Sequence, residues 1–360
     1  MSVSELSSPW QFRQGLWVHN RVALAALTNG QSHDDGTLGE SELRWLTSRA
    51  DGGFGLITSC ASHVARDGQG FRGELGCYDD RHVPGLRRLA AELRARGALS
   101  LLQIFHGGLR ADAALSGEQA WSASASDDGE ARAASVADLE RVIEQFASAA
   151  QRAHAAGWDG VEIHGAHGYL LTQFLSAEMN RRTDDWGGSL ERRARLLRFV
   201  VRAVRARVPA AFVVGVRLSP ENFGYVKGLD LDESLQLARW LVEDGVDFLH
   251  LSLWRALRNT TKYPDLHPIP LFRAAMPDDV ALIAAGGVWT RDDAERVIDL
   301  GASAVALGRA AIANPAWPRE VGESGHEPRR PPLTPAELKE RALSDHFVEY
   351  MRKWQGFVSD

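Results

Sequence analysis

Eight short apolar runs alternate with amphipathic stretches along most of the chain, and this repeat constrains the fold more than any other feature. Apolar runs bounded by turn residues are typical of parallel strands that are buried on both faces. The runs span residues 22–27, 54–58, 99–105, 161–164, 212–218, 248–253, 281–285 and 304–307. Eight strand–helix repeats predict an α/β protein with a (β/α)₈ TIM barrel, and a doubly wound sheet is the alternative that the pattern also allows.

The amphipathic stretches between these runs predict the helices that would cover such a barrel. They span residues 40–49, 80–96, 137–156, 189–208, 232–244, 271–275 and 292–300, with an eighth after residue 314. Gly157, Gly245 and Gly301 follow three of these stretches, at the position where a left-handed residue commonly ends a helix. These glycines therefore lie where the hydrophobic periodicity predicts that helices end.

Two segments fall outside the repeat. Residues 110–134 are rich in Ala, Ser, Asp and Gly, and they predict a surface excursion after the third strand. Residues 323–332 (ESGHEPRRPP) predict a linker. We therefore expect one barrel domain over residues 1–320, followed over residues 321–360 by the linker and a C-terminal helix.

The expected C-terminal helix begins with a recognisable cap. Thr334 and Glu337 have the spacing of a capping box, with a proline at the first helical position. One apolar stripe follows, formed by Leu338, Leu343, Phe347, Met351 and Trp354. This stripe predicts packing on the barrel or on a partner subunit, and the second arrangement would make the protein a homo-oligomer.

Composition limits the partners that the chain is expected to have. Its 360 residues carry a formal net charge of −6, whereas a nucleic-acid-binding face is normally basic, so we expect no nucleic-acid partner. No apolar run approaches the roughly 20 residues that span a bilayer, and no secretory pattern is visible, so we expect no membrane association and a cytoplasmic location. Cys60 and Cys77 are the two cysteines, which excludes a disulfide scaffold and a four-cysteine metal site.

The ends of the last two predicted strands carry the pattern of a phosphate site. Gly286 and Gly287 end the seventh strand, and Gly308 and Arg309 end the eighth. In this fold the corresponding loops often bind phosphate, because glycines let backbone N–H groups approach an anion and arginine adds a charged fork. Glycines also serve ordinary turns, so the pattern alone leaves both interpretations open.

His164, His167 and Tyr169 follow the fourth predicted strand within six residues. They could be structural residues, metal ligands, or a pair of imidazoles that polarises a substrate oxygen while the phenol delivers a proton. A metal would need further ligands, and we expect Glu162 to point away from the two imidazoles. We therefore expect no metal, and the oxyanion interpretation is favoured.

Several segments together resemble the Old Yellow Enzyme family of FMN-dependent ene-reductases, over most of the chain. The most specific combination is His164-Gly-Ala-His-Gly-Tyr-Leu170 with Asn180-Arg-Arg-Thr-Asp-Asp-Trp-Gly-Gly-Ser189 downstream. The other matching segments, in the same order along the chain as in the family, are Asn20-Arg21, Leu102-Gln103-Ile104, Val216-Arg217, Gly286-Gly287 and Leu307-Gly308-Arg309.

The resemblance implies a set of residues that bind FMN and an active site above it. His164 and His167 match the pair that holds a carbonyl or nitro oxygen of the substrate, and Tyr169 matches the proton donor. The implied FMN-binding residues are Ala26, Leu27 and Thr28 after the first strand, Cys60 beside the ring, Gln103 and Arg217 at its pyrimidine edge, and Gly286, Gly287, Gly308 and Arg309 at the phosphate. NAD(P)H would supply the hydride, and activated alkenes or nitro compounds would be the small-molecule substrates.

This chain also departs from one branch of the family, which has Cys at the Thr28 position and Tyr at the Gly30 position. Two other functions stay open from the residues alone: a metal-dependent barrel hydrolase that uses His164 and His167, and a non-catalytic flavin-binding redox regulator. For Trp254 and His106, contact with the site and a purely structural role are both compatible with the sequence.

Overall fold

The computed structural model describes residues 5–224, 226–321 and 326–360. Eight parallel strands form a closed barrel, because the first and the second of them pair with each other as well as with their other neighbours. In chain order they are β3 (Val22–Leu24), β4 (Leu56–His63), β6 (Leu99–Phe105), β9 (Gly160–Gly165), β10 (Val213–Leu218), β11 (Phe248–Ser252), β12 (Ala281–Ala285) and β13 (Ala304–Leu307). Closure confirms the predicted (β/α)₈ barrel and excludes the doubly wound sheet.

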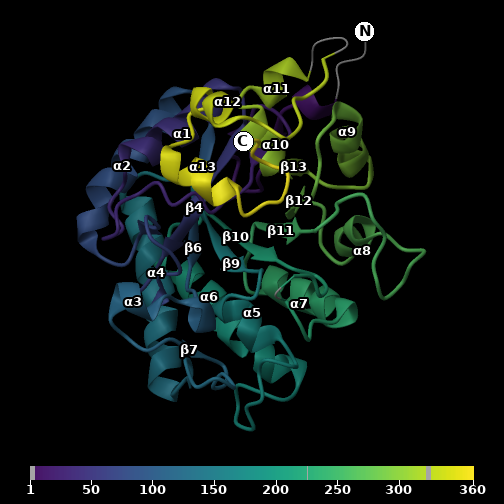
Figure 1. Ribbon diagram of the computed structural model, residues 1–360. Helices are drawn as coiled ribbons and strands as arrows, with labels where there is room; N and C mark the ends of the chain where they lie inside the picture. The colour runs from purple at the N-terminus through teal and green to yellow at the C-terminus, as the bar shows by residue number, and fades with distance from the viewer. Residues whose placement is uncertain (1–4, 225, 322–325) are drawn as a thin grey trace.

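A helix follows each barrel strand (Figure 1). The first seven follow the predicted periodicity, whereas the eighth, expected after residue 314, already begins at Arg309. These helices are α1 (Glu40–Asp51), α2 (Val83–Ala95), α4 (Val136–Ala155), α6 (Leu190–Arg207), α7 (Leu231–Glu243), α8 (Pro268–Ala274), α9 (Arg291–Asp299) and α10 (Arg309–Ala313). Their apolar stripes pack on the outward side chains of the strands, and together they form the larger of two hydrophobic layers. None of the described helices has the length and apolar sequence that crossing a bilayer would require.

The second hydrophobic layer fills the inside of the barrel. A hairpin of β1 (Trp10–Gln11) and β2 (Trp17–Val18) covers the N-terminal end, where the Phe12 ring lies 5.7 Å from that of Phe248. At the other end, three alanines line the space inside the barrel: Ala25, which directly follows β3, Ala285 on β12 and Ala306 on β13. These small side chains leave space at the carboxyl ends of the strands, where active sites lie in this fold.

The C-terminal tail forms two short helices where the sequence predicts one. They are α12 (Pro335–Glu340), which begins with the predicted capping box, and α13 (Asp345–Met351). Between them Ala342 has a φ of 66°, a left-handed conformation that ends the first helix. The break turns α13 across the barrel beside α1, where the Phe347 ring lies 5.6 Å from that of Trp45 (Figure 1). Residues 323–325 of the expected linker lie outside the described residues.

Candidate active site

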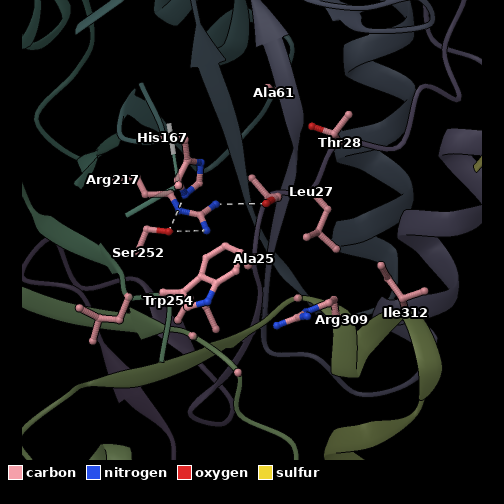
Figure 2. Close-up of a pocket in the computed structure, with 18 of the residues that line it drawn as sticks. Ala25, Leu27, Thr28, Ala61, His167, Arg217, Ser252, Trp254, Arg309 and Ile312 are labelled. Atoms are coloured by element: carbon pink, nitrogen blue, oxygen red, sulfur yellow. Dashed lines mark hydrogen bonds between the residues drawn. The ribbon is translucent and has the colours of Figure 1, made fainter. Parts of the chain in front are cut away.

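A cavity of about 410 Å³ opens at the carboxyl ends of the barrel strands (Figure 2). It brings together most of the residues that the sequence singles out. Those that line it are Ala26, Leu27, Thr28, Gln103, His164, His167, Tyr169, Arg217, Gly286, Gly287, Gly308 and Arg309. They come from six of the eight barrel strands and the loops after them, so the barrel itself assembles the site.

Arg217 stands on β10 at the floor of this cavity. Its two terminal nitrogens donate to the backbone oxygen of Ala26 at 3.1 Å and to Oγ of Ser252 at 3.2 Å, as Figure 2 shows. Its Nε atom is buried without a hydrogen-bond partner among the described residues. Burial lowers the pKa of Arg217 but leaves the side chain a cation, so the floor presents a positive charge and an unused donor to any ligand.

His164 and His167 both line the cavity, and their rings contact each other edge-on, with centroids 4.9 Å apart and planes nearly perpendicular. Burial, followed by the nearby charge of Arg217, lowers the pKa of His164 to about 3 and that of His167 well below its usual value. Both rings are therefore neutral at physiological pH. His167 has a φ of 61°, a conformation that is uncommon outside glycine and often marks a functional site.

The hydrogen bonds of the two rings determine which nitrogen carries the proton. Nδ1 of His164 lies 3.3 Å from the backbone N–H of Ala166 and accepts it, which leaves the ring proton on Nε2. Nε2 of His167 lies 2.6 Å from Oγ of Ser252, which already accepts from Arg217. Among the described residues, Nε2 of His167 is the acceptor available to the hydroxyl proton of Ser252, so the hydroxyl donates to Nε2 and the proton of His167 is on Nδ1. Each neutral ring thus keeps one N–H donor for a ligand.

Tyr169 lies at the N-cap of α5 (Leu170–Leu175), beside the two imidazoles. Its ring packs edge-on against Phe105, with centroids 4.6 Å apart, and the guanidinium of Arg110 lies 4.3 Å above it. Arg110 also donates to the backbone oxygen of His167 at 2.8 Å, so it holds both residues in place. Burial raises the pKa of Tyr169, and the phenol therefore stays protonated and able to donate.

The glycine-rich ends of β12 and β13 form the opposite wall. A side chain at Gly286 would place its Cβ 2.0 Å from the backbone oxygen of Leu253, so this close approach requires glycine. Gly308 is the N-cap of α10, whose first N–H groups have no partner within the helix. The half-buried guanidinium of Arg309 lies 5.3 Å from the ring of Trp354. This wall can bind an anion.

Cys60 is the one predicted site residue whose side chain is not at the cavity. The register of β4 against β6 shifts between Thr58 and Ala61, which marks a β-bulge with one extra residue. The bulge turns Cys60 outward, where its thiol hydrogen-bonds to Glu42, and brings Ala61 to the cavity instead. The structure thus directs the Cys60 side chain away from the cavity, because strict alternation does not hold across the bulge.

The expected direction of Glu162 was wrong. Glu162 and His164 are two residues apart on β9, and residues at this spacing share one face of a strand. Glu162 therefore points into the barrel, where its carboxylate oxygens accept from Gln103 at 2.6 Å and from His250 at 2.7 Å. Both carboxylate oxygens of Glu162 are therefore already hydrogen-bonded. Among the described residues, no group of three His, Cys, Asp or Glu side chains is placed to hold a metal ion.

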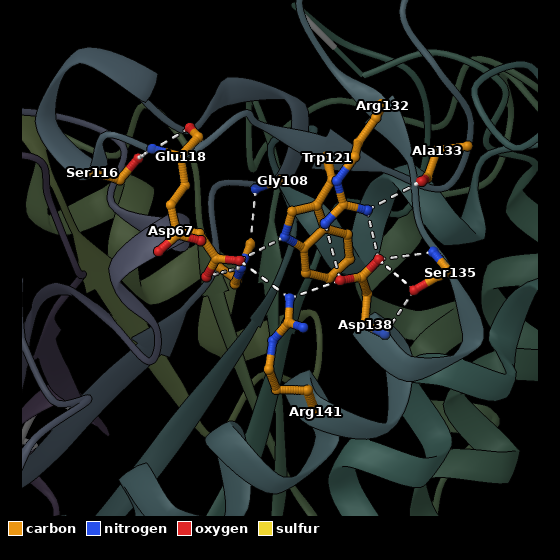
Figure 3. A network of polar contacts seen from close by, with 11 residues as sticks. Asp67, Gly108, Ser116, Glu118, Trp121, Arg132, Ala133, Ser135, Asp138 and Arg141 are labelled. Carbon is orange, nitrogen blue, oxygen red and sulfur yellow. Dashed lines mark hydrogen bonds and ion pairs between the residues drawn. The ribbon is translucent and has the colours of Figure 1, made fainter.

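His106 does not line the cavity. It contacts Gly108 and Asp67, which belong to a polar network that holds the predicted excursion in place (Figure 3). Its Nδ1 accepts the backbone N–H of Gly108 at 3.1 Å, and its Nε2 lies 3.5 Å from Asp67. Asp67 also accepts from the buried Trp121 at 2.9 Å, and Arg141 connects it to Asp138. This network of hydrogen bonds and ion pairs, together with the buried Trp121, therefore holds residues 110–134 in place. His106 has a structural role in it.

Sequence reasoning missed that the tail contributes to the cavity. Tyr350, Met351 and Trp354 line it, and the Tyr350 hydroxyl hydrogen-bonds to Thr28. Trp354 stacks on Trp254, with centroids 6.4 Å apart, so Trp254 also belongs to the mouth. Met351 and Trp354 belong to the apolar stripe of the tail, and no signal in the sequence separates residues that pack from residues that line a site.

The buried histidines lead to a prediction about acid stability. His63 and His164 have pKa values lowered to about 3 by burial, whereas an exposed histidine titrates near 6.5. The unfolded chain therefore binds protons first as the pH falls below about 6.5, which favours unfolding. We expect urea denaturation of the holoenzyme to give a lower free energy of unfolding at pH 5 than at pH 7.5, by roughly 2 kcal/mol for each such histidine. Equal values at the two pH values would contradict the neutral, buried state of these rings.

Comparisons with known proteins agree with this geometry. Residues 5–327 match the NADH:flavin oxidoreductase / NADH oxidase family. The chain is 37% identical over 330 residues to a probable NADH-dependent flavin oxidoreductase of Bacillus subtilis, covering 88% of each chain. It is 34% identical over 321 residues to an NADH:acrylate oxidoreductase of Vibrio harveyi, covering 85% of this chain and 32% of that longer protein.

The solved structure of the Old Yellow Enzyme homologue from Zymomonas mobilis superposes with a TM-score of 0.82. The two chains are 27% identical, and the match covers 94% of this chain and 99% of that one. The shared barrel, the matched sequence profile and the cavity residues lead to one conclusion. The chain belongs to the Old Yellow Enzyme family of FMN-dependent NAD(P)H:flavin oxidoreductases.

Proposed function

We propose that the chain is an ene-reductase, which reduces alkenes conjugated to a carbonyl or nitro group. One observation carries the proposal. Two neutral imidazoles each keep an N–H donor for the same cavity, and a protonated phenol lies beside them. Such a set suits a substrate that gains negative charge on an oxygen and a proton on a carbon.

The cavity residues fit FMN. The buried cation of Arg217, with its unpaired Nε, suits the polar edge of the flavin ring, and Gln103 lies on the same side. Gly286, Gly287, Gly308 and Arg309 would hold the phosphate, and Ala26, Leu27 and Thr28 would contact the ring. FMN, when bound, supplies hydride transfer between NAD(P)H and the acceptor. The small side chains of Ala25, Ala285 and Ala306 leave room for a flat ring.

The two histidines would bind and polarise the substrate oxygen. Nε2–H of His164 and Nδ1–H of His167 are the donors that their other hydrogen bonds leave free. Because both rings are already neutral and held in place, they can stabilise developing negative charge without reorganising. Ser252 is a positioning residue in this scheme, since its contact with Nε2 selects the tautomer of His167.

Tyr169 would donate the proton that the substrate carbon takes up. Its raised pKa keeps it protonated, while the guanidinium of Arg110 above the ring stabilises the phenolate that remains after transfer. The name of one relative supports this substrate class, since acrylate is an alkene conjugated to a carboxyl group. Neither alternative is favoured. A metal hydrolase lacks a third ligand among the described residues, and a non-catalytic regulator has no need of two free donors and a phenol.

An anaerobic absorbance experiment with the purified holoenzyme tests the proposal. Purified holoenzyme is reduced with NADH or NADPH under anaerobic conditions, and cyclohexenone is then added. We expect the flavin absorbance to bleach with the nicotinamide and to recover with the enone, with the saturated ketone as product. Bleaching without recovery on enones, enals or nitroalkenes would contradict the ene-reductase assignment and leave the family assignment intact.

Replacing Tyr169 by phenylalanine should separate the two half-reactions. We expect reoxidation by cyclohexenone to slow on the order of 10²-fold, because a positioned general acid contributes about that much. Reduction by NAD(P)H should stay near the wild-type rate, since it requires no proton from this phenol. Stopped-flow absorbance measures both rates, and Tyr263→Phe, an exposed tyrosine outside the cavity, is the matched control. A large loss in the reductive half-reaction would argue against the proton-donor role.

Trp354→Ala tests whether the tail supports the proposed phosphate wall. The indole lies 5.3 Å from the guanidinium of Arg309, and such a cation–π contact contributes about 0.5–2 kcal/mol. We therefore expect apoprotein titrated with FMN to show a Kd raised roughly 2- to 30-fold. Trp17→Ala, which removes a largely exposed tryptophan at the other end of the barrel, should leave the Kd unchanged. Equal affinity in Trp354→Ala and Trp17→Ala would show that the tail does not position Arg309.

A further inference from the structure

A buried carboxylate lies inside the barrel directly below the cavity. Glu162 is fully buried, and side chains at this depth of a (β/α)₈ barrel are usually branched and apolar. Its Oε1 accepts from Nε2 of Gln103 on β6 at 2.6 Å, and its Oε2 accepts from Nδ1 of His250 on β11 at 2.7 Å. A buried charge is costly unless it is hydrogen-bonded, and here both oxygens have a partner.

The protonation states of this group follow from its surroundings. Burial lowers the pKa of His250, so the ring is neutral and donates from Nδ1, while its Nε2 is buried without a partner among the described residues. Burial alone would raise the pKa of Glu162, but the hydrogen bonds from His250 and Gln103 and the charge of Arg217 hold the pKa below its usual range. Glu162 is therefore ionised, with a neutral histidine on one side and a neutral amide on the other.

The carboxylate restricts how Gln103 can be oriented. An ionised carboxylate only accepts hydrogen bonds, so the contact at 2.6 Å must be made by the Nε2 end of the amide. A flipped amide would place two acceptors against each other. Gln103 therefore offers its Oε1 and its second N–H to the cavity that it lines.

Glu162 also acts on the charge of Arg217. The two side chains stand inside the barrel on adjacent strands, since β9 and β10 pair directly with His164 opposite Arg217. The carboxylate stabilises the cation, and its negative charge reduces the positive potential that Arg217 produces in the cavity above. The negative charge of Glu162 therefore partly neutralises the positive charge of Arg217 at the floor of the cavity.

We propose that Glu162, supported by His250, is a positioning residue that fixes the orientation of Gln103 and partly neutralises Arg217, and that it thereby lowers the reduction potential of bound FMN. The proposal rests on the placement of Gln103 and Arg217 at the polar edge of the ring, which is part of the proposed function. Reduction adds negative charge to the ring, and a carboxylate below it opposes that addition.

Glu162→Gln tests the proposal with little change in shape. The new amide can accept from Gln103 through its oxygen and donate to Nδ1 of His250, whose own proton then moves to the unpaired Nε2. The hydrogen bonds from residue 162 to Gln103 and to His250 are both kept, but the negative charge is gone. We expect the ratio of reduced to oxidised FMN to rise about tenfold at a given solution potential, which corresponds to a midpoint potential higher by about 30 mV.

The measurement is an equilibrium reduction of the holoenzyme with a reference dye, with thermal melting recorded beside it. A lowered melting temperature with an unchanged midpoint potential would show a purely structural role and overturn the proposal. A midpoint potential that falls would overturn the sign of the charge argument. The experiment needs no alkene, so its failure is distinct from a failure to reduce enones.

Glu162→Asp keeps the charge but withdraws it by one methylene, and it serves as the second variant if Glu162→Gln does not fold. We expect its midpoint potential to stay near the wild-type value, while the Kd for FMN rises several-fold because Gln103 is no longer held in one orientation. Glu144→Gln, the same change at a largely exposed carboxylate outside the cavity, is the matched control, and its midpoint potential should stay near wild type. An unchanged Kd in Glu162→Asp would overturn the positioning role.

Discussion

Replacing His164 and His167 together by alanine will slow the reduction of cyclohexenone on the order of 10³-fold while the protein still binds FMN. Removal of one preorganised donor to a developing oxyanion costs about 10²–10³-fold, and the two rings act on one oxygen, so their losses are not expected to multiply fully. The rings lie above the floor formed by Arg217, and flavin reduction and binding should change far less than alkene reduction.

Two measurements check this result. Stopped-flow reoxidation by cyclohexenone gives the loss in rate, and titration with a phenol, whose oxygen would occupy the same donors, gives the loss in affinity. His19→Ala, which removes an exposed histidine outside the cavity, is the matched control and should match wild type. Equal phenol affinity in the double variant and the wild type would contradict the donor pair.

The barrel could be predicted from the sequence because its determinants are local and repeated. Strands buried on both faces read as short apolar runs, and the amphipathic stretches between them have the period of helices. Arg217 lies at the end of one apolar run and His164 at the end of another. The two residues are 53 positions apart in sequence, yet parallel pairing of their strands makes them neighbours. Fold and site were therefore predictable together.

Two features could not be predicted, each for a physical reason. The bulge that exchanges Cys60 for Ala61 depends on the register of β4 against β6, and a register is a property of two strands rather than of one sequence run. The position of Trp354 depends on the break at Ala342 and on packing of Phe347 against Trp45. An apolar stripe indicates that one face of a helix is packed against other residues, but it does not indicate which residues of the stripe also line a cavity.

Replacing Arg217 by methionine is expected to have the largest effect on the cofactor. The variant loses a buried cation, its donors to Ala26 and Ser252, and the Nε donor that suits the polar edge of the flavin. Hydrogen bonds from charged groups contribute about 1.5–3 kcal/mol each, so the Kd of the apoprotein for FMN should rise on the order of 10²-fold. The midpoint potential of the FMN that remains bound should fall, because the positive charge that favours the reduced ring is gone and the ionised Glu162 remains.

Arg217→Lys separates the charge from the geometry. A lysine ammonium keeps the positive charge but cannot reproduce the planar fork that contacts Ala26 and Ser252 at once. We therefore expect its midpoint potential to lie between those of Arg217→Met and the wild type, while its affinity for FMN stays well below wild type. Fluorescence titration of the apoprotein and dye-equilibrated reduction give the two quantities. Wild-type affinity in Arg217→Met would remove Arg217 from the cofactor site, whereas equal potentials in the two variants would mean that its geometry, and not its charge, governs the flavin.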